Sequence, residues 1–528
     1  MNKVHILDCT LRDGGYCNEW KFGFDNVKKV VDGLVEANVE IIECGFITNK
    51  VEYDPDVTKF TNVEQISAII PPNRGNKIFV AMMNYGEYNI NDLPPYDGSS
   101  IDGIRVAFHK KNLEESIQLC EQIKAKGYLV FVQAMVSLSY TDDEFLALIY
   151  TANRVEPYAF YIVDSFGMMK GKNLIRLFYM VEHNLKEDIW IGFHSHNNMQ
   201  LAYSNAQELT RVQTSRNLII DSSIMGMGRG AGNLNSELFL DFLNENAGKN
   251  YDIGPLLTVI DEILDDFYHR NYWGYSLPNY ISAVHNAHPS YAAYLDNKNT
   301  LTIEAMNEIF DMMDDDKKVS YDKTYIEELY LKYQEKDRVQ ERHLADFREK
   351  ICGKKVLLIA PGQTSVTERD KIDVFARRSD VITISINYEY DETLTDFLFV
   401  SNLRRYRDLP VDKRVKSVIT SNIPALDVYL QVRYKDILND IEAVQDNAGL
   451  MLIKLLINLG VKELFIAGMD GYATDFSQNF AIKTMHKALT KDFVEKTNRG
   501  INEGLEQFAK EIHISFVTTP RFVNLTNE

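Results

Sequence analysis

The sequence has little of what marks secreted, membrane-spanning or nucleic-acid-binding proteins. Its 528 residues include five cysteines, none in a CxxC or zinc-like spacing, so we expect reduced thiols and a cytoplasmic protein. No apolar run approaches membrane-spanning length, and the polar first residues hold no signal-peptide core. Acidic residues outnumber basic ones by 76 to 57, and the net charge of −19 predicts no nucleic-acid and no membrane partner.

Nucleotide-binding signatures are also missing. Four glycines occur within residues 226–232, but neither a P-loop Lys-Ser/Thr nor a dinucleotide fingerprint accompanies them. The composition is otherwise that of a globular protein, with 45% hydrophobic and 25% charged residues. A chain of this length is expected to form roughly two to four domains.

Short apolar runs recur through the first half at nearly even intervals. Amphipathic stretches such as residues 26–37, 113–126 and 143–154 lie between them and have helical spacing. Eight strands alternating with helices over about 220 residues are typical of an α/β TIM barrel, (β/α)8. A doubly wound sheet is the alternative, although it rarely needs eight such regular units. The predicted strands are residues 4–7, 40–45, 77–82, 104–108, 129–133, 160–163, 189–193 and 218–221.

Polar residues follow nearly every predicted strand, where a barrel of this kind carries its chemistry. Arg12 and Asp13 come after the first strand and precede two glycines. His194 and His196 end the seventh strand at i and i+2, on the same side of an extended segment. The barrel architecture therefore brings a carboxylate, a guanidinium and two imidazoles to one rim.

Four segments, taken together, resemble the DRE-TIM metallolyase superfamily. They are residues 8–15 (DCTLRDGG), 104–109 (IRVAFH), 192–198 (GFHSHNN) and the glycine-rich stretch 226–237. The 4-hydroxy-2-oxovalerate aldolases are the nearest branch, with isopropylmalate and homocitrate synthases and HMG-CoA lyase as cousins. The resemblance covers residues 3 to 245. It implies a lyase or aldolase that makes or breaks a C–C bond through the enolate of a 2-oxo acid, pyruvate, with an aldehyde as the second partner.

The resemblance also implies a role for individual residues. Asp13, His194 and His196 match the ligands of a divalent metal, Mn or Mg, and Asn233 matches an asparagine that completes or supports the metal site. Arg12 matches the arginine that stabilises the enolate. A metal-bound 2-oxo acid forms an enolate more easily, and a nearby cation meets the developing charge.

Two residues leave the reaction partner open. The aldolases carry a catalytic histidine three residues after the metal aspartate, where this sequence has Tyr16; a phenol ordinarily titrates some 3 to 4 pH units above an imidazole. Tyr16 is interpreted as a catalytic residue, a hydroxyl donor or a pocket residue. Glu43 resembles the acyl-transferring cousins, so a Claisen-type acyl-CoA/2-oxo acid synthase is an alternative, and an inactive metal-binding scaffold is another.

Further strand-end residues are expected at the substrate pocket. They are His109, Gln133, Asp164 and Ser165. For His109 a structural role in the rim is an equal alternative, and Asp164 with Ser165 is favoured to support the metal ligands.

The second half begins with a charged helical stretch and continues as a Rossmann-like α/β domain. Strands are predicted at residues 356–360, 381–386, 397–400, 418–420 and 463–467. Small polar residues at strand ends are typical of a phosphate or nucleotide site. This half is weakly similar to sialyltransferase-like and pterin-pyrophosphokinase-like (MptE-type) proteins, which implies nucleotide or nucleotide-sugar binding. A scaffold that dimerises or gates the barrel is the alternative. The residues proposed to bind a nucleotide are Gly362, Gln363, Thr364, Ser365, Asn387 and Asp470.

We therefore expect three parts: a barrel domain (residues 1–290), a helical connector (291–350) and a Rossmann-like domain (351–528). The connector is a candidate subunit interface, and we expect a homo-oligomer. The C-terminal domain with which the aldolases dock an aldehyde dehydrogenase is not recognisable, so that partner is not predicted.

Overall fold

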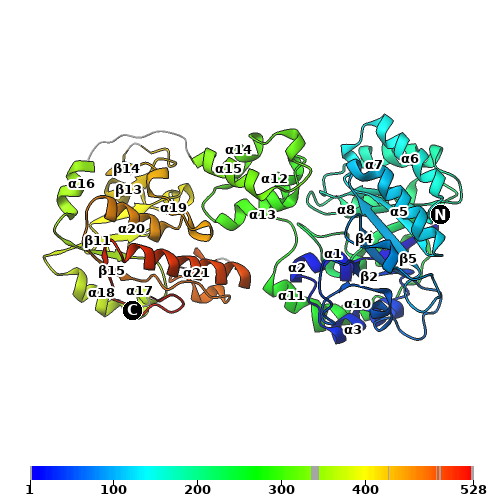
Figure 1. Ribbon diagram of the computed structural model, residues 1–528, viewed down its shortest axis with the longest axis horizontal. Coiled ribbons are helices and arrows are strands. Elements are labelled where there is room, and N and C mark those ends of the chain that lie inside the picture. The colour runs from blue at the N-terminus through cyan, green and yellow to red at the C-terminus, as the bar shows by residue number, and fades with distance from the viewer. Residues whose placement is uncertain (1–2, 335–343, 426, 483–484, 487–488, 525–528) are drawn as a thin grey trace. The chain divides into compact units, whose positions relative to one another are not determined.

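The structure is a computed structural model that describes residues 3–334, 344–425, 427–482, 485–486 and 489–524. The contacts between residues divide the chain into two units. Unit 1 comprises Met1–Ala293 with Met313–Tyr321, and unit 2 comprises Tyr294–Met312 with Asp322–Glu528. Each unit carries its own parallel sheet (Figure 1).

Unit 1 is a closed barrel of eight parallel strands. All eight strands predicted from apolar runs are present, and β1 pairs with both β9 and β2, which closes the ring. The TIM-barrel prediction is confirmed. A short additional strand, β3, pairs with the end of β2. The strands are β1 (Lys3–Asp8), β2 (Ile41–Ile47), β3 (Lys59–Phe60), β4 (Ile78–Asn84), β5 (Gly103–Phe108), β6 (Leu129–Ala134), β7 (Ala159–Asp164), β8 (Trp190–Ser195) and β9 (Asn217–Ser222).

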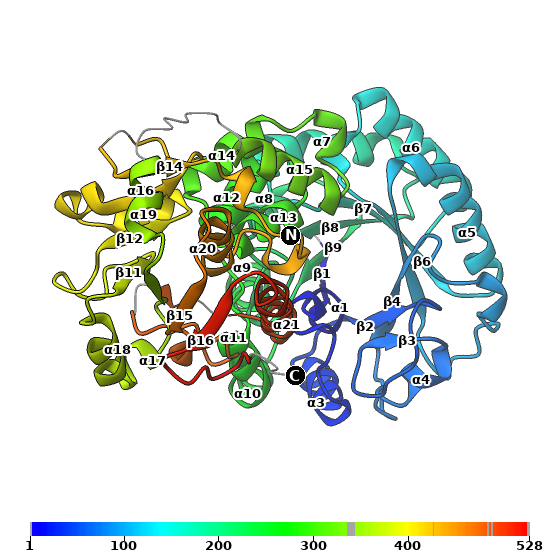
Figure 2. The same cartoon turned by 60° about the vertical axis from the view of Figure 1, so that its left-hand side comes forward.

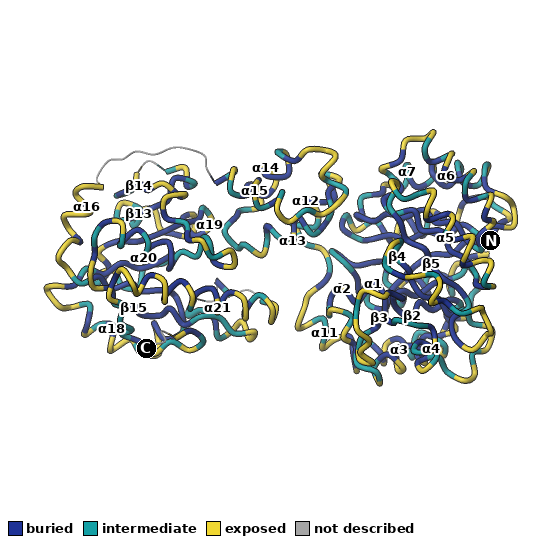
Figure 3. Tube along the Cα trace, viewed as in Figure 1, coloured by how far each residue is buried: buried dark blue, intermediate teal, exposed yellow. Residues whose placement is uncertain are grey.

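Helices surround these strands and bury one face against them. In Figure 2 the helices α5, α6 and α7 lie outside the strands of the barrel, and Figure 3 shows the strands as the buried centre of the unit. Helix α6 begins with a capping box, in which the Thr141 hydroxyl accepts from the backbone of Glu144. The helices between and after the strands are α1 (Thr10–Asp13), α2 (Gly15–Asn18), α3 (Phe24–Glu36), α4 (Val63–Ser67), α5 (Leu113–Ala125), α6 (Asp142–Val155), α7 (Gly171–Asn184), α8 (Ala202–Arg211), α9 (Ser236–Ala247), α10 (Gly254–Val259), α11 (Asp265–Arg270), α12 (Leu277–Val284) and α13 (Pro289–Lys298).

Alternation along the strands decides which side chains fill the barrel. In β6, Val130 and Val132 pack toward the helices while Phe131 packs inside the barrel, so Gln133, two residues further, lies on the inner side near the carboxyl end. The barrel interior is crowded at Gly192, where a Cβ atom would lie 2.3 Å from the ring of Tyr161. The same alternation places Arg105 and His194 on the inner side of their strands, because their neighbours pack outward.

Unit 2 contains a second parallel sheet with strand order β14-β13-β12-β11-β10-β15-β16. The order reverses between β10 and β15, so the carboxyl ends of these two neighbouring strands form the switch point of a Rossmann-like sheet. The five strands predicted from the sequence are present, and β14 and β16 at the two edges were not predicted. The strands are β10 (Lys355–Ile359), β11 (Val381–Ile386), β12 (Phe397–Val400), β13 (Ser417–Thr420), β14 (Leu430–Val432), β15 (Glu463–Ala467) and β16 (His513–Phe516).

Helices of unit 2 include those expected for a connector. Residues 294–312 and the chain from 322 group with the second sheet by contacts, and residues 335–343 of the expected connector lie outside the described residues. The expected domain boundaries stay a prediction. No helix in the described parts of the chain has the length and apolar character needed to cross a membrane. The helices are α14 (Ile303–Asp311), α15 (Lys323–Gln334), α16 (Leu344–Ile351), α17 (Thr364–Thr367), α18 (Arg369–Ala376), α19 (Leu403–Asp408), α20 (Ala448–Asn458) and α21 (Lys491–Phe508).

Candidate metal centre

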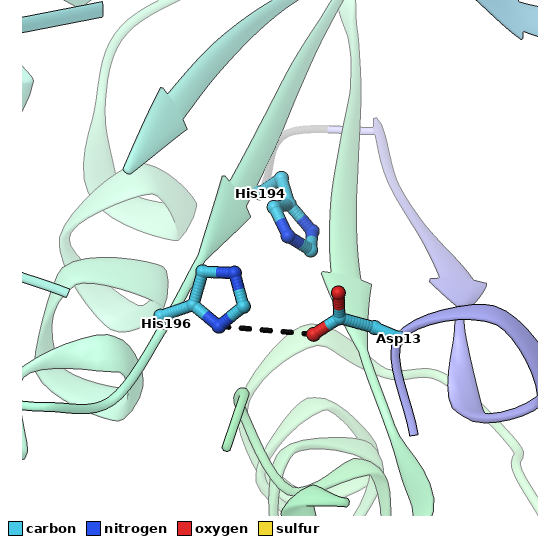
Figure 4. A group of neighbouring side chains, drawn as sticks. All are labelled: Asp13, His194 and His196. Carbon is cyan, nitrogen blue, oxygen red and sulfur yellow. Dashed lines mark ion pairs between the residues drawn. The ribbon is translucent and has the colours of Figure 1, made fainter. Parts of the chain in front are cut away.

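Asp13, His194 and His196 meet at the carboxyl end of the barrel. Asp13 ends the short helix α1 that follows β1, His194 lies in β8, and His196 comes just after that strand. All three are buried, and one ligand atom from each lies within 4.8 Å of the others. Figure 4 shows both imidazole rings beside the Asp13 carboxylate. The barrel thus brings together a carboxylate and two imidazoles that are about 180 residues apart in sequence.

Neighbouring side chains orient two of these ligands. The Nδ1 atom of His194 lies 2.9 Å from Oδ2 of Asp221 on the adjacent strand β9. A proton on Nδ1 leaves the lone pair of Nε2 free for a metal ion. Asn233 donates from Nδ2 to Asp13 Oδ2 at 2.7 Å and to the carbonyl oxygen of Met227 at 3.2 Å. The amide of Asn233 therefore holds the Asp13 carboxylate in place.

The buried atoms of this group fit a divalent cation. His196 Nδ1 lies 3.7 Å from Asp13 Oδ2 and, like Asn233 Oδ1, has no hydrogen-bond partner among the described residues. Burial lowers the pKa of His196 to about 3, so the ring is a neutral donor. Burial alone would raise the pKa of Asp13, but the positive charge of Arg12 holds it well below its usual range. An ionised carboxylate with neutral imidazoles is the ligand form that a divalent metal needs.

Arg12 lies beside this group. Its Nη1 donates to Asp13 Oδ1, its Nε donates to Glu43 Oε2 at 2.9 Å, and its Nη2 is buried without a partner among the described residues. The arginine has therefore one buried donor group left for an oxygen of a bound molecule. Glu43 Oε2 accepts from two arginines, Arg12 and Arg105, and its position between them makes it the counter-charge of both.

Arg105 and Asp221 complete a charged network. Asp221 is one of the polar strand-end residues expected at the rim, whereas Arg105 was given no role from the sequence. Arg105 is fully buried inside the barrel and donates to Glu43 Oε2 at 2.7 Å and to Asp221 Oδ2. Asp221 in turn contacts His194, so the network runs from Arg12 to a candidate metal ligand. A charged residue between two apolar neighbours, as in Ile104-Arg105-Val106, is the local signal that could have found it.

Tyr16 lies in helix α2, three residues after Asp13. Its side chain is 43% exposed, its ring packs edge-to-face with Trp20 at 4.7 Å, and the Arg229 guanidinium lies 5.5 Å from the ring centre. Arg229 also donates to the carbonyl oxygen of Ser165 at 2.9 Å, and its Nη1 lies 3.4 Å from His288 Nε2. His288 follows the barrel and was not singled out from the sequence.

The four remaining rim residues have different surroundings. With its amide oxygen turned toward Arg105, Gln133 accepts from Nη2 at 3.0 Å. The Asp164 carboxylate accepts from the backbone of Met168 and Met169, and burial raises its pKa to about 7. The Ser165 hydroxyl accepts from the backbone of Val136 at 2.9 Å. His109 is half-buried, which lowers its pKa. Gln133, Asp164 and Ser165 thus bond to the protein itself, and substrate contact by any of the four stays a prediction.

The glycine-rich stretch approaches the metal ligands by its backbone. A Cβ atom on Gly228 would lie 2.3 Å from Asn233 Nδ2 and 2.7 Å from Asp13 Oδ2. Gly228 has no unusual φ, so the requirement for glycine here comes from space alone. His196 and Asn233 form an isolated antiparallel bridge between the loop and the end of β8.

Of the residues expected to bind a nucleotide, Gly362–Ser365 and Asp470 lie at the switch point of unit 2, and Asn387 follows the neighbouring strand β11. Asp470 accepts from the backbone and hydroxyl of Thr364, and the Ser365 hydroxyl donates to the carbonyl oxygen of Gly362. Gln363 donates from Nε2 to the carbonyl oxygen of Phe480 at 2.7 Å. Asn387 has φ +62° and a buried side-chain oxygen without a partner among the described residues.

Comparison with known proteins identifies the barrel. Residues 3–259 match the HMGL-like family model. A 4-hydroxy-2-oxovalerate aldolase from Pseudoalteromonas translucida is 25% identical over 270 residues, 50% of this chain and 76% of that protein. A 4-hydroxy-2-oxovalerate aldolase from Geobacillus genomosp. 3 is 29% identical over 270 residues, 50% of this chain and 77% of that protein. An oxaloacetate decarboxylase from Mycobacterium tuberculosis is 27% identical over 263 residues, 49% of this chain and 74% of that protein. The barrel of this chain is an HMGL-like domain of the DRE-TIM superfamily of aldolases and lyases.

Proposed function

We propose that the barrel is a divalent-metal-dependent aldolase or lyase that makes or breaks a C–C bond through the enolate of a 2-oxo acid, pyruvate. The observation that carries this proposal is the buried group of Asp13, His194 and His196, whose ligand atoms lie within 4.8 Å of one another beside Arg12. The aldolase names of the relatives support the reaction type.

Asp13, His194 and His196 would hold Mn or Mg, with Asn233 Oδ1 as a further oxygen at the same place. A bound divalent ion lowers the free energy of enolate formation by polarising the keto group. Arg12 is positioned beside the ligands with a free, buried Nη2, and a guanidinium there can donate to an oxygen that gains negative charge. Glu43 and Asp13 fix the direction of the guanidinium, so little reorganisation accompanies the change in charge.

Tyr16 and Arg229 would control how water and substrate reach the site. Tyr16 and Arg229 stack on each other, whereas the ligands are buried. A substrate aldehyde would enter past this pair. The Tyr16 hydroxyl has no hydrogen bond to a described residue and is free to contact it.

The test is proton exchange at the methyl group of pyruvate in D2O, followed by proton NMR. We expect loss of the methyl signal with Mn or Mg and no loss with EDTA, in spectra recorded after the paramagnetic Mn has been removed. His194→Ala should abolish both exchange and metal binding, while the control His183→Ala, at an exposed histidine on α7, should keep both. Arg12→Lys should keep metal binding and slow exchange, because a lysine cannot make both hydrogen bonds of the guanidinium.

Two outcomes would contradict the proposal. Exchange that survives in His194→Ala would refute the ligand assignment. Thiol release from acetyl-CoA with a 2-oxo acid, without pyruvate exchange, would favour the Claisen-type reaction instead.

A further inference from the structure

Unit 2 contains a cavity of about 1010 Å³ at the carboxyl ends of its strands. The cavity lies at the switch point between β10 and β15, where open parallel sheets bind their ligands. Gly362 and Gly468 line it by their backbones. A Cβ on Gly362 would lie 2.3 Å from the carbonyl oxygen of Gly468. The two strand ends can therefore lie this close only because Gly362 has no side chain. The volume is that of a site for a ligand of nucleotide size, since such sites span roughly 300–1,000 Å³.

Arg405 is a buried cation in the wall of this cavity. Its backbone N–H donates to Asn402 Oδ1 at 2.9 Å at the start of α19, and its side chain is 6% exposed. Its nearest carboxylate is Asp408, at 3.4 Å from Nη1, and this carboxylate is 56% exposed. Burial lowers the pKa of Arg405, and the attraction of Asp408 does not offset it.

The guanidinium of Arg405 therefore has donors that no described residue uses. A guanidinium carries five N–H groups in a planar fork, and Asp408 takes one of them through a long hydrogen bond. Arg405 is a wall residue of the cavity. Burying a cation whose one carboxylate partner is itself exposed costs free energy. A bound anion would offset that cost.

The other cations of the described cavity wall have carboxylate partners within the protein. Asp470 and Asp446 accept hydrogen bonds from hydroxyl groups, so these two wall carboxylates are engaged as well. Arg405 differs from the lysines in being almost fully buried. The paired lysines are Lys298 with Glu327 (3.7 Å), Lys323 with Glu442 (2.5 Å) and Lys496 with Asp492 (2.7 Å).

Helix α20 adds positive potential to the same wall. Its first residues, Ala448 and Gly449, line the cavity, and the helix has 11 residues. The Asn447 side chain caps Gly449 and Leu450, so the helix contributes its dipole more than free N–H groups. Asn387 brings a buried, unpartnered side-chain oxygen to the wall, a hydrogen-bond acceptor for a ligand hydroxyl or amino group.

We propose that this cavity binds a phosphorylated small molecule of nucleotide size, with its phosphate group against Arg405. The planar fork of an arginine matches two phosphate oxygens, and the volume leaves room for a sugar or base beyond the phosphate. This differs from the expectation that the turn at Gly362–Ser365 holds the phosphate. The Asp470 carboxylate occupies that turn and would repel an anion.

Isothermal titration of the full chain, with EDTA present so that a metal in the barrel cannot contribute, tests this proposal. The probes are nucleoside diphosphates (ADP, GDP, CDP and UDP), glucose 1-phosphate, inorganic phosphate, succinate and an uncharged nucleoside. We expect at least one phosphorylated probe to bind, and at least ten-fold more tightly than succinate or the nucleoside. This comparison needs no variant, so a folding defect cannot imitate it.

Variants then locate the phosphate. Arg405→Gln should weaken binding at least ten-fold, Arg405→Lys should restore part of it, and the control Arg404→Gln, at the adjacent exposed arginine, should leave it unchanged. The probe that binds most tightly identifies the source, whether nucleotide, sugar phosphate or free phosphate. The proposal is overturned if no phosphorylated probe binds, if succinate binds as tightly, or if Arg405→Gln binds like the unaltered chain.

Discussion

The Nδ1 atom of His194 lies 2.9 Å from Oδ2 of Asp221, so a strand neighbour holds this proposed metal ligand in place. The same carboxylate also accepts from Arg105, which fixes it from the other side. The orientation of His194 therefore depends on a residue that does not itself belong to the ligand group.

Replacing Asp221 should weaken metal binding without removing a ligand. Because carboxylates behind ligating histidines affect metal affinity by roughly 10- to 100-fold, we expect Asp221→Asn to weaken Mn binding by about that factor. Titration calorimetry with Mn measures it, and Asp188→Asn, at an exposed aspartate before β8, is the control. An unchanged affinity in Asp221→Asn would show that His194 is oriented by other contacts.

Removing the charge of Arg105 should destabilise the barrel strongly. Arg105→Met leaves Glu43 and Asp221 buried without their shared cation, and breaking such a pair costs about 3–5 kcal/mol. We expect a loss of that size in the free energy of unfolding measured with urea. The control Arg176→Met breaks an exposed pair with Asp142 and should cost at most about 1 kcal/mol. Equal effects of the two substitutions would contradict the role of Arg105.

A methyl group at Gly228 should disturb the metal site by its volume. The new Cβ would overlap Asn233 Nδ2 and press on Asp13 Oδ2. We therefore expect Gly228→Ala to lower Mn affinity while circular dichroism shows the fold retained. Gly171→Ala is the matched control, since the nearest atom to its Cβ lies 3.8 Å away. Full Mn affinity in Gly228→Ala would show that the loop can move aside.

His288 should make stability fall in acid. Burial and the charge of Arg229 lower its pKa to about 3, whereas an unfolded histidine titrates near 6.5. Between these values the unfolded state binds more protons, so the free energy of unfolding decreases as the pH falls below about 6.5. His288→Gln should reduce this slope by up to about 1.4 kcal/mol per pH unit. Urea unfolding from about pH 7.5 to about pH 5, with His183→Gln as control, checks it. Parallel curves for His288→Gln and the unaltered chain would contradict it.

Much of the fold could be predicted because parallel strands are buried on both faces. Such strands are continuous apolar runs, as in Ile189–Phe193 or Val356–Ala360, and these runs were found. Besides the two-residue β3, the missed strands are the edges of the second sheet: β14 has three residues, and β16 is only partly buried. The residues of neither strand form a hydrophobic pattern that distinguishes the strand from a loop.

Within the candidate site, the residues that belong to sequence motifs were predicted. Asp13, His194 and His196 stand next to one another in space because their strand ends meet, which the barrel prediction implied. The ion pairs of Arg105 were not predicted, since they depend on the register of β5 against strands that lie up to 116 residues away in sequence. His288 was missed for a similar reason, because its contact with Arg229 comes from a segment beyond the barrel.

The seam at which β1 pairs with β9 has a consequence for the order of assembly. β9 lies between β1, which Asp13 follows, and β8, which carries His194 and precedes His196; Asn233 follows β9 in the chain. During synthesis about 180 residues separate Asp13 from His194 and His196, and Asn233 is made later still. The proposed metal site is thus complete only when the ring closes, and a partly synthesised barrel lacks it.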